Sequence, residues 1–258
     1  MKILISPVLI LVFMMLLGFN DYNSKSETEK KEVLLLATQN FNDLIKINRT
    51  FKILSDSSYI FTELVKEENH SKSETFQGLV KIDNDTIKFS PFLLDFNISE
   101  TAVLKNGFIE FIDGEYPERM KFEITKLNVN NNLDTQKFPN YAIFTFYKKF
   151  NKQEWQKEYS NYDLNNQELL KIDQIFKKEF SNNKRLETFD KYLKQIVAVR
   201  NNKNEILIQA HFFCKNTSLL ESYQYYESMM NDGGNCNVYA ELNLTTGKFN
   251  YFNIAGLA

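Results

Sequence analysis

The chain is poor in the residues on which most catalytic and cofactor-binding motifs depend. Its 258 residues include only eight Gly, four Pro, two Cys and two His. Glycine-rich nucleotide-binding loops are therefore nearly excluded, and the chain has no Gly-x-x-x-x-Gly-Lys, Gly-x-Ser-x-Gly or His-Glu-x-x-His motif. A conventional zinc site needs three or four convergent ligands, and two separated histidines leave too few if the two cysteines form a disulfide. We therefore predict no catalytic, cofactor-binding or metal-binding residue of an established type.

The chain also lacks an excess of charge of either sign. Lys and Arg total 31 against 33 Asp and Glu, which gives a formal net charge of −2. Nucleic-acid-binding proteins concentrate Lys and Arg on one face, so we expect no nucleic-acid partner. Hydrophobic residues make up 43% of the chain and aromatic residues 14%. This composition is typical of a chain that folds around a globular core.

The first twenty residues differ from the rest of the chain. Lys2 precedes an apolar run over residues 3–17, and the sequence becomes polar after Gly18. This layout predicts a signal peptide over residues 1–20, although no Ala-x-Ala cleavage motif follows. The alternative is an uncleaved membrane anchor, because the run reaches the lower length limit for a bilayer span. In both cases the rest of the chain is expected outside the cytoplasm, in the periplasm or the extracellular space. The Asn-, Lys- and Ile-rich composition favours a bacterial source.

Residues 21–150 are expected to form a first domain, in which an N-terminal helix packs on a curved antiparallel β-meander. The helix is predicted from apolar residues at helical spacing. These residues are Val33, Leu36, Phe41, Leu44 and Ile45. From residue 57 onward, short alternating segments are typical of antiparallel strands. Turns are expected at residues 83–85 and at Asn106-Gly107, the second of type I′.

Residues 151–258 are expected to form a smaller helix-plus-antiparallel-sheet domain that ends in a β-hairpin, so the predicted fold class is α+β. Asn165 with Glu168 is a capping-box pattern at the start of a helix. A second helix is expected over residues 186–193, followed by a hairpin that turns at residues 201–204. Residues 218–230 fit a helix or a strand, and the Ser218 and Glu221 capping pattern favours the helix.

The two cysteines are predicted to form a disulfide. Alternation along their strands places Cys214 and Cys236 on the apolar faces. Export brings the chain into an oxidising compartment, and two paired strands can bring cysteine Cα atoms within the necessary 4.4–6.8 Å. The alternatives are two inert buried thiols, or a strand register that holds them apart. The adjacent Asp232-Gly233-Gly234 sequence is interpreted as a turn with positive φ angles.

The remaining candidates for chemistry are Asp113, Glu115 and His211. The two carboxylates follow a predicted strand and could serve a hydrolase. His211 lies on the polar face of its strand, where a general base is conceivable. Exposed turn carboxylates and a hydrogen-bonded structural histidine are the simpler interpretations.

The sequence favours an exported, non-enzymatic binding or interaction protein of the bacterial cell envelope. Its partner is expected to be a small apolar ligand or another protein. One alternative is an exported hydrolase that uses Asp113 and Glu115, with or without His211. A second alternative is a structural envelope component that contacts the membrane only through an uncleaved leader.

Overall fold

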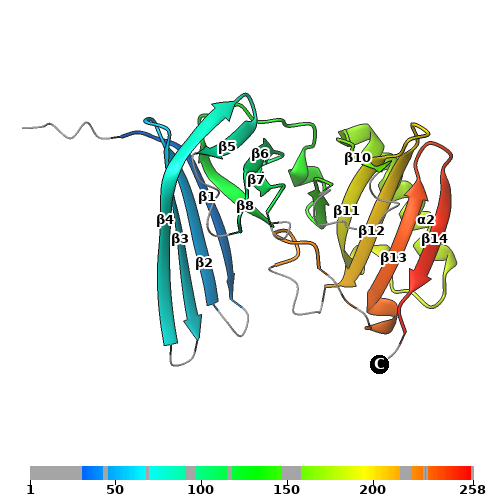
Figure 1. Ribbon diagram of the computed structural model, residues 1–258. Helices are drawn as coiled ribbons and strands as arrows, with labels where there is room; N and C mark the ends of the chain where they lie inside the picture. Colours follow the sequence, from blue (N-terminus) through cyan, green and yellow to red (C-terminus); the bar gives the residue numbers. More distant parts are fainter. Residues whose placement is uncertain are drawn as a thin grey trace, which may run out of the picture. The chain divides into compact units, whose positions relative to one another are not determined.

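Strands dominate the part of the chain that can be described (Figure 1). The computed structural model describes residues 31–42, 46–67, 70–90, 97–114, 118–146, 158–215, 222–228, 230 and 232–256. These residues form fourteen strands and one α-helix. None of their helices is long and apolar enough to cross a membrane. The predicted leader, residues 1–20, lies outside the described residues.

The first eight strands form a closed antiparallel barrel. Each strand pairs with the next, and β1 pairs with β8 to close the barrel. The strands are β1 (Val33–Asn42), β2 (Lys46–Leu54), β3 (Ser58–Glu67), β4 (His70–Asp83), β5 (Thr86–Ser90), β6 (Thr101–Lys105), β7 (Phe108–Phe111) and β8 (Glu118–Thr125).

The predicted N-terminal helix is wrong, because Val33–Asn42 form strand β1. Leu44 and Ile45 of that prediction lie outside the described residues. Leu35, Ala37 and Gln39 are all fully buried, which is the two-residue period of a strand. In so short an apolar run, helical and strand periods select overlapping sets of residues, and spacing alone does not separate them. Pairing with both β2 and β8 decides the outcome. The fold is therefore mostly β with a closed barrel, and the α+β prediction is corrected.

Aromatic rings fill the centre of the barrel. Phe51 packs edge-on against Phe111, with ring centroids 5.9 Å apart, and Tyr59 packs against Phe89 at 5.3 Å. Gly78 lies opposite Tyr59 in the neighbouring strand. A Cβ at this position would come within 2.6 Å of the Tyr59 ring, so β4 needs glycine there. A packed aromatic core, rather than a helix, therefore occupies the barrel.

Both predicted turns in the barrel are confirmed. Asn84, with φ 54°, links β4 to β5, and Asn106 (φ 49°) with Gly107 (φ 86°) links β6 to β7. The two consecutive positive φ angles are those of the type I′ hairpin turn.

A second sheet contains the remaining strands. Its strands are β9 (Tyr141–Phe144), β10 (Ser160–Asn161), β11 (Tyr192–Arg200), β12 (Ile206–Cys214), β13 (Asn237–Asn243) and β14 (Lys248–Ile254). Strands β10 to β14 are antiparallel neighbours in that order, and β9 pairs parallel to β11. Helix α2 (Asn166–Asn182) covers one face of this sheet (Figure 1).

Helix α2 begins as the sequence predicts. The Asn165 side chain accepts hydrogen bonds from the backbone N–H groups of Gln167 and Glu168, and the Glu168 carboxylate accepts one from the Asn165 N–H. The buried face of the helix packs on strand side chains such as Phe212, whose ring centroid lies 4.8 Å from that of Phe176.

Two further helix predictions do not hold. Within residues 186–193 the structure has one 3₁₀ turn, η3 (Phe189–Lys191), and β11 begins directly at Tyr192. The strand prevails because its side chains are buried on both faces, as expected for an inner strand. Of residues 218–230, residues 222–225 form turns and residues 226–228 and 230 are in neither a helix nor a strand; residues 218–221 and 229 lie outside the described residues. The predicted hairpin over β11 and β12 is confirmed.

Candidate functional site

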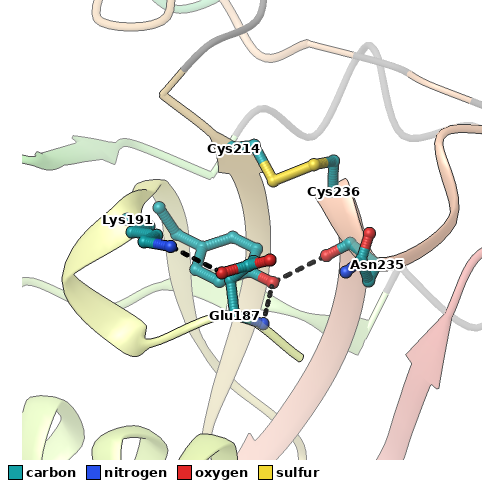
Figure 2. The surroundings of a disulfide bond; sticks show 6 residues. Glu187, Lys191, Cys214, Asn235 and Cys236 are labelled. Carbon is teal, nitrogen blue, oxygen red and sulfur yellow. Dashed lines mark hydrogen bonds and ion pairs between the residues drawn. A yellow bond between two sulfur atoms is a disulfide. The ribbon is translucent and has the colours of Figure 1, made fainter. Parts of the chain in front are cut away.

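The predicted disulfide joins Cys214 to Cys236, whose Cα atoms are 4.7 Å apart (Figure 2). Next to it, the Tyr192 hydroxyl donates a hydrogen bond to the carbonyl oxygen of Asn235 at 2.7 Å. Gly233 and Gly234 have positive φ angles, as predicted for the turn before the second cysteine. The pair therefore joins the end of β12 to the start of β13. A structural disulfide fits a protein that is exported to an oxidising compartment.

A non-repetitive segment, residues 222–228, is held by polar side chains of the second sheet; we call this segment the strap. Gln195 of β11 donates from Nε2 to the carbonyl oxygens of Tyr223 (2.5 Å) and Tyr226 (2.7 Å). Its Oε1 accepts a hydrogen bond from the Ser228 N–H at 2.8 Å. Backbone groups that lack strand partners must be satisfied in another way, and here a buried glutamine does so.

His211 is part of the same support. Its Nδ1 lies 3.1 Å from the carbonyl oxygen of Ser228, and its Nε2 lies 2.6 Å from Oδ1 of Asn237. Asn237 is fully buried and donates from Nδ2 to the carbonyl oxygen of Met230 at 3.0 Å. Burial lowers the pKa of His211 to about 4, against the hydrogen bonds to Asn237 and Ser228, which favour its protonated form. At physiological pH His211 is therefore neutral, and its single N–H donates to one of these two oxygens.

The other candidates from the sequence do not join His211. Asp113 follows β7, and its Oδ1 accepts hydrogen bonds from the backbone N–H groups of Glu100 (3.0 Å) and Thr101 (2.9 Å). Glu115 lies outside the described residues. The hydrogen bonds of Asp113 and His211 tie each residue to its own part of the fold.

A cavity of about 240 Å³ lies where barrel strands, helix α2 and the strap meet. Its lining combines aromatic and aliphatic side chains with a few polar ones. The lining residues are Asn106, Phe108, Arg119, Lys121, Leu133, Thr135, Gln136, Phe138, Pro139, Tyr141, Ile143, Leu169, Tyr223 and Gln224. A concave apolar site with a small number of convergent polar groups is the usual form of a small-molecule site. This cavity is the candidate functional site.

Arg119 is the buried cation of the cavity. Its Nη1 donates to the carbonyl oxygen of Ile143 at 2.6 Å and to Oε1 of Glu110 at 3.2 Å. Its guanidinium carbon lies 4.1 Å from the ring centroid of Phe108 and 4.2 Å from that of Phe144. Burial lowers the pKa of Arg119, and Glu110 acts against that shift. Since the ordinary pKa of arginine lies far above the physiological range, the side chain stays charged.

Asn106 contributes a buried amide to the cavity wall. Its Oδ1 accepts a hydrogen bond from the Leu133 N–H at 3.1 Å, which fixes the orientation of the amide. Its Nδ2 is buried and has no hydrogen-bond partner among the described residues. Such a group is costly to bury without a partner. Sequence analysis identified Asn106 as a turn residue and missed this second role, because the contact with Leu133 is not visible in a local pattern.

Charge around the cavity is uneven. Arg119 and the exposed Lys121 line it, and its described lining contains no Asp or Glu. Two carboxyl groups lie close to Arg119: that of Glu110, which is paired with it, and that of Glu227 in the strap. Loss of hydration and the proximity of Glu110 raise the pKa of Glu227 to about 7. Below that pH the local charge is therefore positive.

Two other polar regions resemble a ligand site less closely than this cavity does. A space of about 480 Å³ beside the disulfide is lined by Glu187, Asp190, Lys191, Lys215 and the two cysteines, so its charges balance. Inside the barrel, Arg49 pairs with Glu63 at 2.5 Å and with Glu118. Within the described ranges, no three His, Cys, Asp or Glu side chains are grouped so that they could hold a metal ion.

No protein-family model, curated protein or solved structure matches this chain. The case for a function therefore depends on the geometry of the cavity.

Proposed function

We propose that this protein is an exported, non-enzymatic binding protein of the bacterial cell envelope, and that the cavity beside Arg119 holds its ligand, a small and largely apolar molecule. The observation that carries the proposal is the cavity itself. It combines walls such as Phe138 and Ile143 with a buried, oriented polar edge at Asn106 and Arg119. Apolar walls supply affinity, and a few fixed polar groups set the orientation of the ligand.

The side chains around the cavity are already held in place, which favours binding. Arg119 is fixed by three hydrogen bonds to Ile143, Glu110 and Gln224. The hydroxyl of Tyr223 donates to the carbonyl oxygen of Pro139 at 2.8 Å. A site organised before binding loses less conformational entropy when the ligand arrives. By contrast, the carboxylate and histidine of the hydrolase alternative have hydrogen bonds that serve their own backbone surroundings.

The test is native mass spectrometry of the protein purified from the exported fraction of its own host. Two variants of neighbouring α2 residues make the test specific to the cavity. Leu169→Trp adds volume to a buried residue that lines the cavity, and Leu170→Trp makes the same change at a residue that is 50% exposed. Circular dichroism checks that both variants keep the fold, because overpacking can cost about 1–3 kcal/mol.

We expect a mass excess that disappears on denaturation, is retained in Leu170→Trp and is lost in Leu169→Trp. A bare mass for the wild-type chain, or a mass excess that both variants retain, would contradict a ligand in this cavity. The same spectrum reports whether residues 1–20 have been removed, which is the expected result for an exported chain with a cleaved leader.

A further inference from the structure

We propose that the ligand of this cavity is a monocarboxylate with an apolar body, whose carboxylate is held at the edge formed by Arg119, Asn106 and Lys121. This inference rests on the proposed function and names the chemical class of the ligand. Three features of the polar edge support it: the sign of its charge, the hydrogen-bond donors that have no partner, and the amount of charge.

The sign of the charge favours an anion. Two cations, Arg119 and Lys121, line the cavity, and its described lining contains no carboxylate. The carboxylate of Glu110 is engaged, because its Oε2 accepts a hydrogen bond from the Thr145 N–H at 3.0 Å while Oε1 pairs with Arg119. A cation beside poorly hydrated apolar walls attracts an anion more strongly than it would in bulk water.

The hydrogen-bond donors without partners also favour an anion. Arg119 uses Nε and Nη1 for its hydrogen bonds, and its Nη2 makes none to a described residue. Nδ2 of Asn106 is also without a partner in the described part of the chain, while its Oδ1 is occupied by the Leu133 N–H. A carboxylate accepts several hydrogen bonds and donates none. It is therefore complementary to an edge at which N–H groups remain to be satisfied.

The net charge of the polar edge favours a ligand with a single negative charge. At pH 6 Glu227 is mostly protonated, because burial raises its pKa to about 7. Arg119 and Lys121 then supply two positive charges, and Glu110 removes one of them. The remainder matches a carboxylate, whereas a dianionic phosphate would bury a second negative charge without a counterpart. Burying such an uncompensated charge is costly.

The test compares acid and amide pairs that share one apolar body: phenylacetate with phenylacetamide, and hexanoate with hexanamide. Each is titrated by NMR into the folded, ligand-free protein at pH 6, below the pKa of about 7 of Glu227. Lys121→Gln removes the accessible charge of the cavity. Lys88→Gln is the matched control, because Lys88 is an exposed barrel lysine outside the cavity lining.

We expect the acids to bind about tenfold more tightly than the amides. Lys121→Gln should weaken acid binding several-fold and leave amide binding unchanged, and Lys88→Gln should alter neither. Asn106→Asp keeps a residue that tolerates positive φ and replaces the free donor with a carboxylate oxygen, so it should abolish the preference for acids.

Equal affinity for acids and amides, with shifts at the cavity, would overturn the anion inference and leave the proposed binding function standing. If Lys88→Gln weakens acid binding as much as Lys121→Gln does, the anion inference would be overturned as well. If neither acids nor amides shift cavity resonances and the native mass is bare, the proposed function fails together with the inference.

Discussion

The barrel and the second sheet bury polar side chains in different ways. The buried polar side chains of the barrel include a cation, Arg49, which contacts the carboxyl groups of Glu63 and Glu118 and the neutral amide of Gln39; all four side chains come from its strands. On the strap side of the second sheet the buried polar side chains are neutral, with Gln195, His211 and Asn237 as the main members.

The difference follows from how the backbone N–H and C=O groups find hydrogen-bond partners in each region. Around the barrel, β1 to β8 pair in a closed ring, and the polar side chains inside bond mainly to one another; Gln39 also donates from Nε2 to the carbonyl oxygen of Arg119 at 3.3 Å. Against the second sheet lies the strap, whose turns cannot pair as a strand, so Gln195 and His211 supply hydrogen bonds to its backbone groups. Opposite charges suit a self-contained group inside a barrel. Amide and imidazole groups suit a backbone that offers both donors and acceptors.

The largest effect is expected from removing the cation of the barrel. In Arg49→Met, measured at pH 8 where Glu118 is mostly ionised, the carboxylates of Glu63 and Glu118 lose their common partner while remaining in the barrel interior. Breaking a buried ion pair from one side costs about 3–5 kcal/mol, so the free energy of unfolding in urea should fall by that amount. Lys46→Met is the control, because Lys46 is an exposed residue of the same strand. A loss for Arg49→Met no larger than that of the control would show that the barrel charges are not coupled.

A somewhat smaller effect, confined to the other region, is expected from removing the disulfide. The Cys214–Cys236 bond joins residues that are 22 positions apart, with the strap between them. On the chain-entropy account, its loss in the Cys214→Ala/Cys236→Ala double variant should cost about 3 kcal/mol. Hydrogen exchange should become faster in the strap and change less in strands β2 and β3, which serve as the internal reference. Uniform loss of protection across both regions would mean that the two regions unfold as one unit.

Local rules predicted part of this fold. The Asn165 capping box, the Asn106-Gly107 turn and the hairpin over β11 and β12 each depend on residues a few positions apart. The disulfide prediction used compartment and strand alternation, and it is confirmed. Where the outcome depended on distant strands, as at β1 with its partner β8, the local pattern was ambiguous and the helix prediction was wrong.

The candidate site could not be predicted in this way. Asn106, Arg119, Leu169 and Tyr223 meet at the cavity from four separate elements. None of them belongs to a motif, and the packing that leaves Nδ2 of Asn106 without a partner requires the contact with Leu133. His211, which the sequence did single out, holds the strap instead. The functional signal of this chain therefore lies in tertiary contacts.

The smallest expected effect is on the pH dependence of stability, because the two regions contain titratable groups whose pKa values shift in opposite directions. Burial raises the pKa of Glu118 to about 7 despite Arg49, whereas burial lowers that of His211 to about 4. Between about pH 4.5 and 7 the native barrel holds a proton at Glu118 that the unfolded chain has lost, so this group makes stability fall as pH rises. Between about pH 6.5 and 4 the unfolded chain protonates His211 first, so that group makes stability fall as pH falls.

In the wild type the two contributions oppose each other between about pH 4.5 and 6.5. In Glu118→Gln only the His211 contribution remains, so the free energy of unfolding should rise with pH. In His211→Gln only the Glu118 contribution remains, so the free energy of unfolding should fall as pH rises. Each slope is at most about 1.4 kcal/mol per pH unit, which urea unfolding at pH 5, 5.5 and 6 can resolve. If both variants change the slope in the same direction, one of the two groups is not held in the protonation state that its burial implies, and the contrast between the two regions fails at that residue.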